Sequence, residues 1–184
     1  MEDMLEILRV VHTGGARAFL THKEHVLPYA VQEPYALPTF RAKSSVYFSV
    51  NAYKEDDKTV AQQNALFARF DKDHEFGAFS GAMDYVNHIH PRYIIDNVGS
   101  ITCFWVFSEP FVIKTAQDLL IAKSRQVGWF RYIGADYYTN TAPLAIGANK
   151  VVKLGTSCHC MTGLDDRIAG KDPYTEFLRR TNAN

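Results

Sequence analysis

The sequence predicts an α/β fold (α+β), in which helices pack on a mixed or antiparallel sheet. Three observations lead to this prediction. Stretches of alternating apolar and polar residues, rich in β-branched and aromatic side chains, recur along the chain. Other stretches carry apolar residues at helical spacing and are bounded by capping residues, glycine or proline. Their order (strand, strand, helix, hairpin, helix, strand) is typical of a sheet covered by helices. With 184 residues, 47% of them hydrophobic, the chain suits one domain with a sizeable core.

The N-terminal part predicts a helix, a strand and a loop. Residues 3–11 place apolar side chains at helical spacing, and Gly14 and Gly15 end that helix. Residues 17–24 are typical of a short strand and turn. Residues 26–40 contain three prolines, which favour an extended loop on the surface.

The central part has the most regular patterns. Its expected elements are a strand (44–53), a polar connection (54–63), a second strand (64–73) and a helix (77–90) closed by Pro91. Alternation along the second strand predicts two faces. One carries Leu66, Ala68 and Phe70, and the other carries Phe67 and Arg69.

The C-terminal half begins with a predicted hairpin, made of strands 92–97 and 101–110 joined by a glycine turn. A helix over 115–134 follows, with Thr115 as its cap and Asp118 completing a capping box. Its expected apolar face consists of Leu119, Leu120, Val127 and Phe130. One or two short strands and a closing helix (172–180) complete the chain. We expect one domain over 1–184, divided into an N-terminal unit (1–40), a core (41–155) and a C-terminal strand and helix (156–184).

Composition excludes several classes of protein. Twenty basic and twenty acidic residues give a formal net charge of zero, which argues against a strongly basic, non-specific nucleic-acid binder. The three cysteines form no CxxC pair, so a reducing compartment is expected. The start of the chain does not resemble a signal peptide, and no apolar run reaches the ~18 residues of a membrane span. We expect a soluble, cytoplasmic protein without a membrane partner.

Two aspartates end the second strand of the central part. Asp71 and Asp73 are separated by one residue, so both carboxylates point to the same side of a strand. Carboxylates held this close repel each other unless a cation lies between them, and hard oxygen ligands suit Mg²⁺ or Mn²⁺. Two-metal phosphoryl transfer uses such a pair. The alternative is a charged turn, in which Asp is common. His74 and Glu75 next to them are then outer groups of the site or solvated turn residues.

Other clusters carry weaker predictions. His88 and His90 resemble the metal-binding pair of rolling-circle nicking enzymes, although Pro91 follows at once and a helix end with histidines is the alternative. The triplet 158–160 (Cys-His-Cys) lacks the usual zinc spacing and is better explained as a strand with buried thiols. Scattered basic residues could form a template groove or a solvated face: Arg41, Lys43, Lys54, Lys58, Lys123, Arg125, Arg131, Arg179 and Arg180.

An ordered series of motifs resembles the archaeo-eukaryotic primase superfamily, in particular the small primase and primase-polymerase domains of plasmids, phages and integrated elements. The matching segments are 46–51 (VYFSVN), 67–73 (FARFDKD), 91–97 (PRYIIDN), 104–105 (FW) and 134–136 (GAD). The resemblance covers about residues 40–155. It implies an RRM-like catalytic sheet with an added N-terminal α/β unit. It also implies a nucleotidyltransferase that makes primers on single-stranded DNA from nucleoside triphosphates, with a replicative helicase as a further expected partner.

The resemblance also assigns residues. Asp71, Asp73 and Asp136 are the expected catalytic acids and ligands of Mg²⁺ or Mn²⁺, and Ser100, Thr102 and Lys150 are the expected triphosphate contacts. Two departures matter. Thr102 stands where the family often has a histidine, and the segment after Asp136 has no arginine. The alternative function is therefore a degenerate primase-like module that binds an origin or single-stranded DNA, or docks a helicase, without chemistry.

Overall fold

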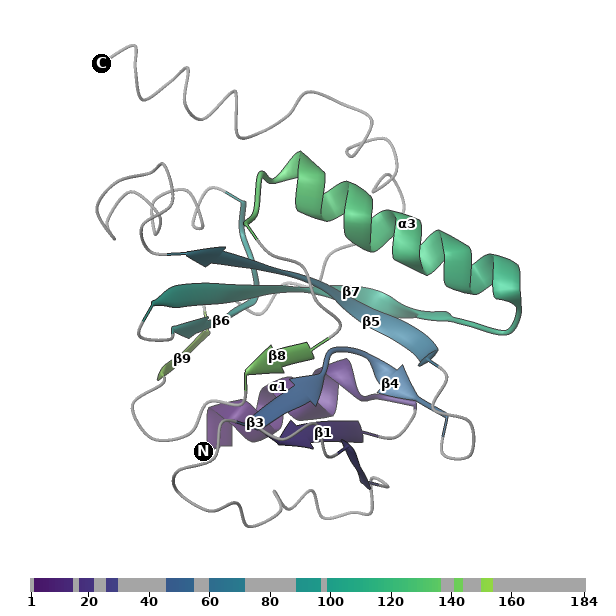
Figure 1. Cartoon of the computed structure of the whole chain (residues 1–184), viewed down its shortest axis with the longest axis horizontal. Coiled ribbons are helices and arrows are strands. Elements are labelled where there is room, and N and C mark those ends of the chain that lie inside the picture. The colour runs from purple at the N-terminus through teal and green to yellow at the C-terminus, as the bar shows by residue number, and fades with distance from the viewer. Residues whose placement is uncertain are drawn as a thin grey trace.

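Two antiparallel sheets and two helices make up the part of the chain that the computed structural model describes (Figure 1). The described residues are 2–14, 17–21, 26–29, 46–54, 60–71, 89–96, 99–136, 141–143 and 150–153. The fold is of the predicted α+β class, and every strand pairing is antiparallel. Neither described helix has the length and apolar character to cross a membrane.

The larger sheet has five strands in the order β4-β5-β7-β6-β9. Their bounds are β4 Ala52–Tyr53, β5 Val60–Asp71, β6 Tyr93–Asp96, β7 Ser100–Val112 and β9 Lys150–Lys153. The predicted hairpin is confirmed, since β6 and β7 pair directly. Strand β5 begins at Val60 rather than at residue 64, so the end of the expected polar connection belongs to the sheet. The expected helix over 77–90 lies outside the described residues, apart from its last two positions.

The smaller sheet has four strands in the order β2-β1-β3-β8. Their bounds are β1 Arg17–Thr21, β2 Val26–Tyr29, β3 Val46–Ser49 and β8 Thr141–Pro143. Two expectations are wrong here. The expected loop 26–40 begins with strand β2, and the expected single strand 44–53 is divided between the two sheets as β3 and β4. Asn51 lies at this division with φ +89°, a left-handed conformation that breaks a strand and that Asn tolerates better than most residues.

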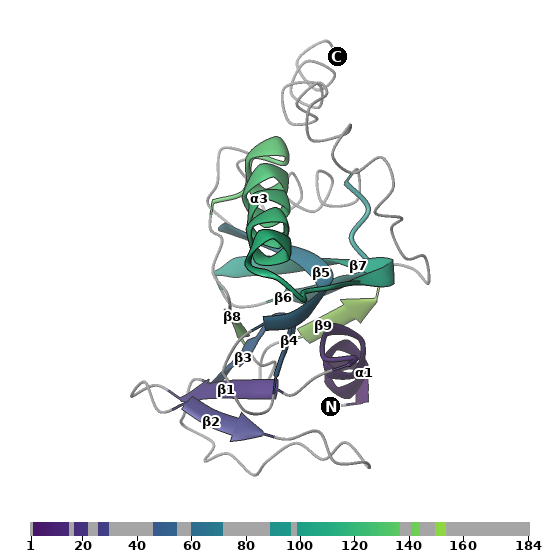
Figure 2. The ribbon, with the colours of Figure 1, turned by 90° about the vertical axis from the view of Figure 1, so that its right-hand side faces the viewer.

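Helices cover the two faces of the larger sheet (Figures 1 and 2). Helix α1 (Glu2–Val11) lies on one face together with the smaller sheet, and helix α3 (Ala116–Tyr132) lies on the other. The predicted alternation of β5 is confirmed. Phe67 packs in the core with α1, and Leu66, Ala68 and Phe70 pack in the core with Trp129 of α3.

Helix α3 starts as predicted but buries a different face. Thr115 caps it, and its hydroxyl and the Asp118 carboxylate form the reciprocal bonds of a capping box. Its buried residues are Ala122, Gln126 and Trp129, whereas Leu120 is 58% exposed. The apolar face expected from Leu119, Leu120, Val127 and Phe130 is therefore wrong. A polar residue, Gln126, occupies the centre of the contact with the sheet.

Candidate active site

The end of β5 and the start of β7 bring three predicted site residues to one face of the larger sheet. Asp71 lies opposite Ser100 in the pairing of the two strands, and Arg69 lies opposite Thr102. Because opposite residues in an antiparallel pair share a face, Arg69, Asp71, Ser100 and Thr102 all project to the side on which Phe67 contacts α1. The order of motifs in the sequence is thus converted into a cluster in space.

Thr102 is the most enclosed member of this cluster. It is 2% exposed, and its hydroxyl has no hydrogen-bond partner among the described residues. An unpaired buried hydroxyl costs on the order of 1–3 kcal/mol, so such groups call for an explanation. Ser100 is 3% exposed. Both side chains face the site, but they lie deep in it.

Arg69 is a member of the site that the sequence did not single out. Its Nη2 lies 3.4 Å from Oδ1 of Asp71, and its side chain is 44% exposed against 27% for Asp71. The pair lies in contact with solvent, so screening limits its contribution to stability. The position of Arg69 matters more than the strength of this ion pair, because the residue lies directly opposite Thr102 in the strand pairing.

Asp136 meets the end of β5 from the other edge. Its Oδ2 accepts a hydrogen bond from the backbone N–H of Asp71 at 2.8 Å, and its own N–H donates to the carbonyl of Arg69 at 3.1 Å. The two bonds imitate one step of a β-ladder on the edge of β5 that none of the described strands covers at this point. The structure therefore brings Asp136 to Asp71, with one carboxylate oxygen engaged by the backbone of β5.

Two other side chains satisfy the same edge of β5 further back. Gln126 donates from Nε2 to the carbonyl of Phe67 at 2.6 Å and accepts from the N–H of Phe67 through Oε1 at 3.3 Å. Asn51 accepts through Oδ1 from the N–H groups of Asn64 at 2.9 Å and Ala65 at 3.3 Å. This explains the polar residue at the centre of α3. No local pattern in the sequence indicated this role.

The side-chain oxygens at this end of the sheet suit a divalent metal ion. Asp71 and Asp136 supply carboxylate oxygens of the kind that Mg²⁺ or Mn²⁺ prefers. Asp73, His74 and Glu75 lie outside the described residues, and within the described part no group of three or more metal-binding side chains comes together. Lys150 begins β9 opposite Asp96, which lies opposite Ile101 on the α3 face of the sheet, so this position is not on the face of Ser100 and Thr102. The assignment of Asp73 as a ligand stays a prediction.

The histidine pair and the cysteine triplet contribute nothing to this site within the described residues. His88 and the triplet 158–160 lie outside them, and His90 is exposed at φ +52°. Cys103 is fully buried between sheet and α3, and burial raises the pKa of its thiol, which keeps it protonated and unreactive.

A comparison with solved structures matches the archaeo-eukaryotic primase (AEP) domain of the cyanophage S-2L primase-polymerase, PrimPol. The match has a TM-score of 0.64 and 14% sequence identity, and it covers 91% of this chain and 97% of that domain. No protein-family model and no curated protein matches the sequence. This chain shares its fold with that AEP domain. The fold expected from the motif series is thereby supported by a likeness that does not depend on sequence identity.

Proposed function

We propose that the protein is a primase or primase-polymerase type of nucleotidyltransferase that makes primers on single-stranded DNA for replication of a mobile element. The observation that supports this most strongly is the position of Asp71. It ends strand β5 of a primase-like fold and shares a face with Ser100 and Thr102, in the order of the motif series. A fold alone does not define an activity. Here the fold and the acidic strand end point to the same chemistry.

In this proposal, three carboxylates have one purpose. Asp71 and Asp73 would hold Mg²⁺ or Mn²⁺, and Asp136 would assist them while it fixes the end of β5 through the N–H of Asp71. Bound metal would lower the pKa of the attacking 3′-hydroxyl and offset the charge of the triphosphate. The chain itself holds Asp136 at the end of β5 through the bond between its Oδ2 and the N–H of Asp71.

The triphosphate would lie along the start of β7. Ser100 and Thr102 offer hydroxyl donors there. Lys150 does not join them, because the strand register puts it opposite Asp96 and Ile101, on the α3 face of the sheet. Arg69 provides a cation directly opposite Thr102. We propose that its guanidinium supplies the charge that related primases often obtain from a histidine, because a planar fork of N–H donors matches phosphate oxygens.

The decisive experiment is primer synthesis on single-stranded template with Mg²⁺ or Mn²⁺. The wild-type chain is expected to incorporate nucleotides, and the double variant Asp71→Ala with Asp73→Ala is expected to lose incorporation by several orders of magnitude, because both proposed ligands are gone. The matched control is Glu109→Ala, which removes an exposed carboxylate near the end of β7. Activity that survives in the double variant would exclude the assignment.

A second candidate is a degenerate primase-like module that binds DNA without chemistry. The specific observation in its favour is the enclosure of Ser100 and Thr102, which are 3% and 2% exposed. Calorimetry separates the two candidates. Tight single-strand binding, with no metal-dependent binding of nucleoside triphosphate, would favour the module, whereas measurable incorporation would remove it.

A further inference from the structure

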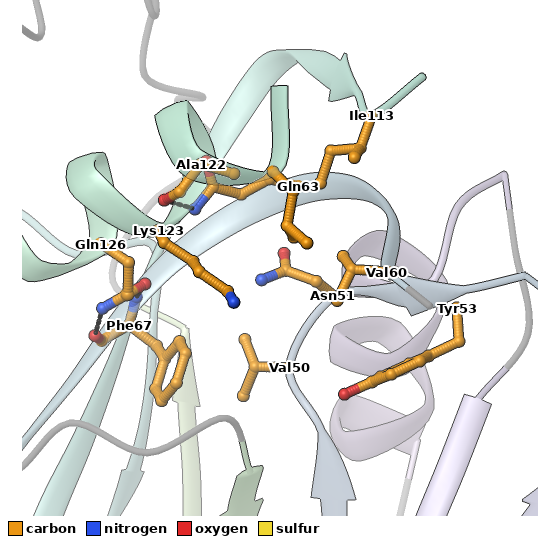
Figure 3. A pocket seen from close by; sticks show the side chains of 11 residues that line it. Val50, Asn51, Tyr53, Val60, Gln63, Phe67, Ile113, Ala122, Lys123 and Gln126 are labelled. Carbon is orange, nitrogen blue, oxygen red and sulfur yellow. Dashed lines mark hydrogen bonds between the residues drawn. The ribbon is translucent and has the colours of Figure 1, made fainter. Parts of the chain in front are cut away.

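A small cavity of about 70 Å³ opens where β4, the edge of β5 and α3 meet (Figure 3). Apolar side chains form most of its wall, among them Val50 and Phe67. The side-chain nitrogens of Lys123, on α3, and of Asn51, just before β4, point into it. None of the described residues that line it is acidic. The cavity is therefore an apolar recess with a positive charge and hydrogen-bond donors at its mouth.

The orientation of Asn51 is fixed by its backbone partners. Its Oδ1 accepts from the N–H groups of Asn64 and Ala65, so its Nδ2 must face the other way, into the cavity. The residue holds this place at φ +89°, a costly conformation for any residue other than glycine. The strain and the two accepted bonds together present a preorganised amide N–H₂ group.

The second donor is the ammonium of Lys123 on α3. This side chain is exposed and forms no ion pair with any described residue. Tyr53 from β4 adds a hydroxyl near the cavity, and burial raises the pKa of that hydroxyl, which keeps it a donor. Among the residues that the structure describes, the cavity thus combines one cation and two neutral donors, a combination that suits an oxyanion.

The cavity lies along the strand that carries the proposed metal site. Phe67 lines it, and Asp71 follows four residues later on the same strand, on the order of 13 Å away. It opens on the edge of β5 that faces α3, whereas Ser100 and Thr102 lie across the opposite edge, on β7. A ligand in the cavity is therefore distinct from a triphosphate held along β7.

We propose that Lys123 and Asn51 bind a phosphate group in this cavity, and that it belongs to the backbone of the single strand on which the protein acts. The inference rests on the proposed function for the identity of the ligand. Apolar walls beside a phosphate site suit a nucleic acid, because sugar carbons flank every backbone phosphate. The other source of the same chemistry is the phosphate tail of a free nucleoside triphosphate.

The test is direct binding, without catalysis. Fluorescence anisotropy with a labelled single-stranded oligothymidylate, in chelator, measures affinity over a range of salt concentrations. Lys123→Ala removes the positive charge of the ammonium. Asn51→Asp keeps an oxygen that accepts from β5, and Asp also tolerates positive φ, but the N–H₂ donor is replaced by a second carboxylate oxygen. Lys114→Ala removes an exposed charge just before α3 and is the matched control.

Lys123→Ala and Asn51→Asp are each expected to weaken oligothymidylate binding roughly three- to tenfold, and Lys123→Ala is expected to reduce the salt slope by about 0.7, the loss of one phosphate contact. Lys114→Ala is expected to change neither. If both variants weaken nucleoside triphosphate binding instead, the oxyanion site stands and its ligand is the free nucleotide. Unchanged affinity for both probes, or equal loss in Lys114→Ala, would overturn the proposal. Primer synthesis is measured separately, so a wild-type chain that binds the strand through Lys123 and Asn51 but synthesises no primer would count against the proposed function alone.

Discussion

Replacing Gln126 by alanine is expected to destabilise the protein through the edge of β5. The side-chain amide forms two hydrogen bonds with the backbone of Phe67, one donated at 2.6 Å and one accepted at 3.3 Å. Gln126 is 5% exposed and Phe67 is 4% exposed. Alanine would therefore leave a backbone N–H and a backbone carbonyl unpaired where α3 covers the strand.

The magnitude follows from these two bonds. A typical intramolecular hydrogen bond contributes about 1 kcal/mol, and a buried group left without a partner costs about 1–3 kcal/mol. The bond accepted at 3.3 Å is long and the weaker of the two. We expect Gln126→Ala to lower the free energy of unfolding by about 2–4 kcal/mol, a large part of the 5–15 kcal/mol that is typical of a domain.

Urea unfolding followed by tryptophan fluorescence measures this loss, because Trp105 and Trp129 stack edge to face in the core at 5.2 Å between ring centroids. Gln117→Ala is the control, since Gln117 is exposed in the first turn of the same helix, and we expect it to stay within about 0.5 kcal/mol of wild type. If the two variants differ by less than about 0.5 kcal/mol, Gln126 does not act as a substitute for a strand.

Three further predictions concern the site and the helix that supports it. Asp136→Asn keeps an oxygen that can accept from the N–H of Asp71, so it is expected to unfold like wild type yet to lose primer synthesis. Asp136→Ala is expected to lose primer synthesis and, in addition, about 1–2 kcal/mol of stability. Full primer synthesis by Asp136→Asn would mean that Asp136 only positions the end of β5. Arg69→Ala is expected to raise the KM for nucleoside triphosphate about tenfold, with partial rescue by lysine in steady-state kinetics, because lysine restores the charge but not the fork; an unchanged KM would exclude Arg69 as a phosphate contact. Thr115→Ala is expected to cost about 1 kcal/mol in urea unfolding at pH 7. The backbone N–H groups of Thr115 and Lys114 lower the pKa of Asp118, so the cap contributes fully to stability above the ordinary carboxyl pKa. The cost of Thr115→Ala should therefore shrink as the pH falls below about 4. A cost that does not change in acid would contradict the reciprocal cap.

Alternation and capping were sufficient to predict the main elements of the larger sheet. The two faces of β5 follow from its period of two, and the start of α3 follows from Thr115 and Asp118. The division of 44–53 into two strands could not be seen, because its β-branched and aromatic residues suit a strand throughout. The break depends on Asn51 taking a positive φ, and two backbone donors from a strand distant in sequence hold it there.

The candidate site was predictable only in part, for a similar reason. Asp71 was found because two acids at i and i+2 have a local chemical meaning, and Asp136 because it belongs to a motif series. Arg69 and Gln126 have no such local signal. Arg69 becomes relevant only when the strand register places it opposite Thr102, and Gln126 only when α3 lies against an uncovered strand edge. Both depend on contacts between elements that single-residue patterns do not encode.

The uncovered edge of β5 connects the stability of the fold to its proposed chemistry. An open strand edge invites pairing with another chain, and proteins usually cover it or charge it. Here β4 covers only the first part, and side chains of Asn51, Gln126 and Asp136 satisfy the rest at intervals up to Asp71. A full strand in that place would fill the space between Asn51 and α3. Side-chain substitutes close the edge against aggregation and leave open the cavity in which Lys123 and Asn51 converge. The same three side chains therefore hold the strand end that carries Asp71 and preserve the recess that we propose for the nucleic-acid backbone.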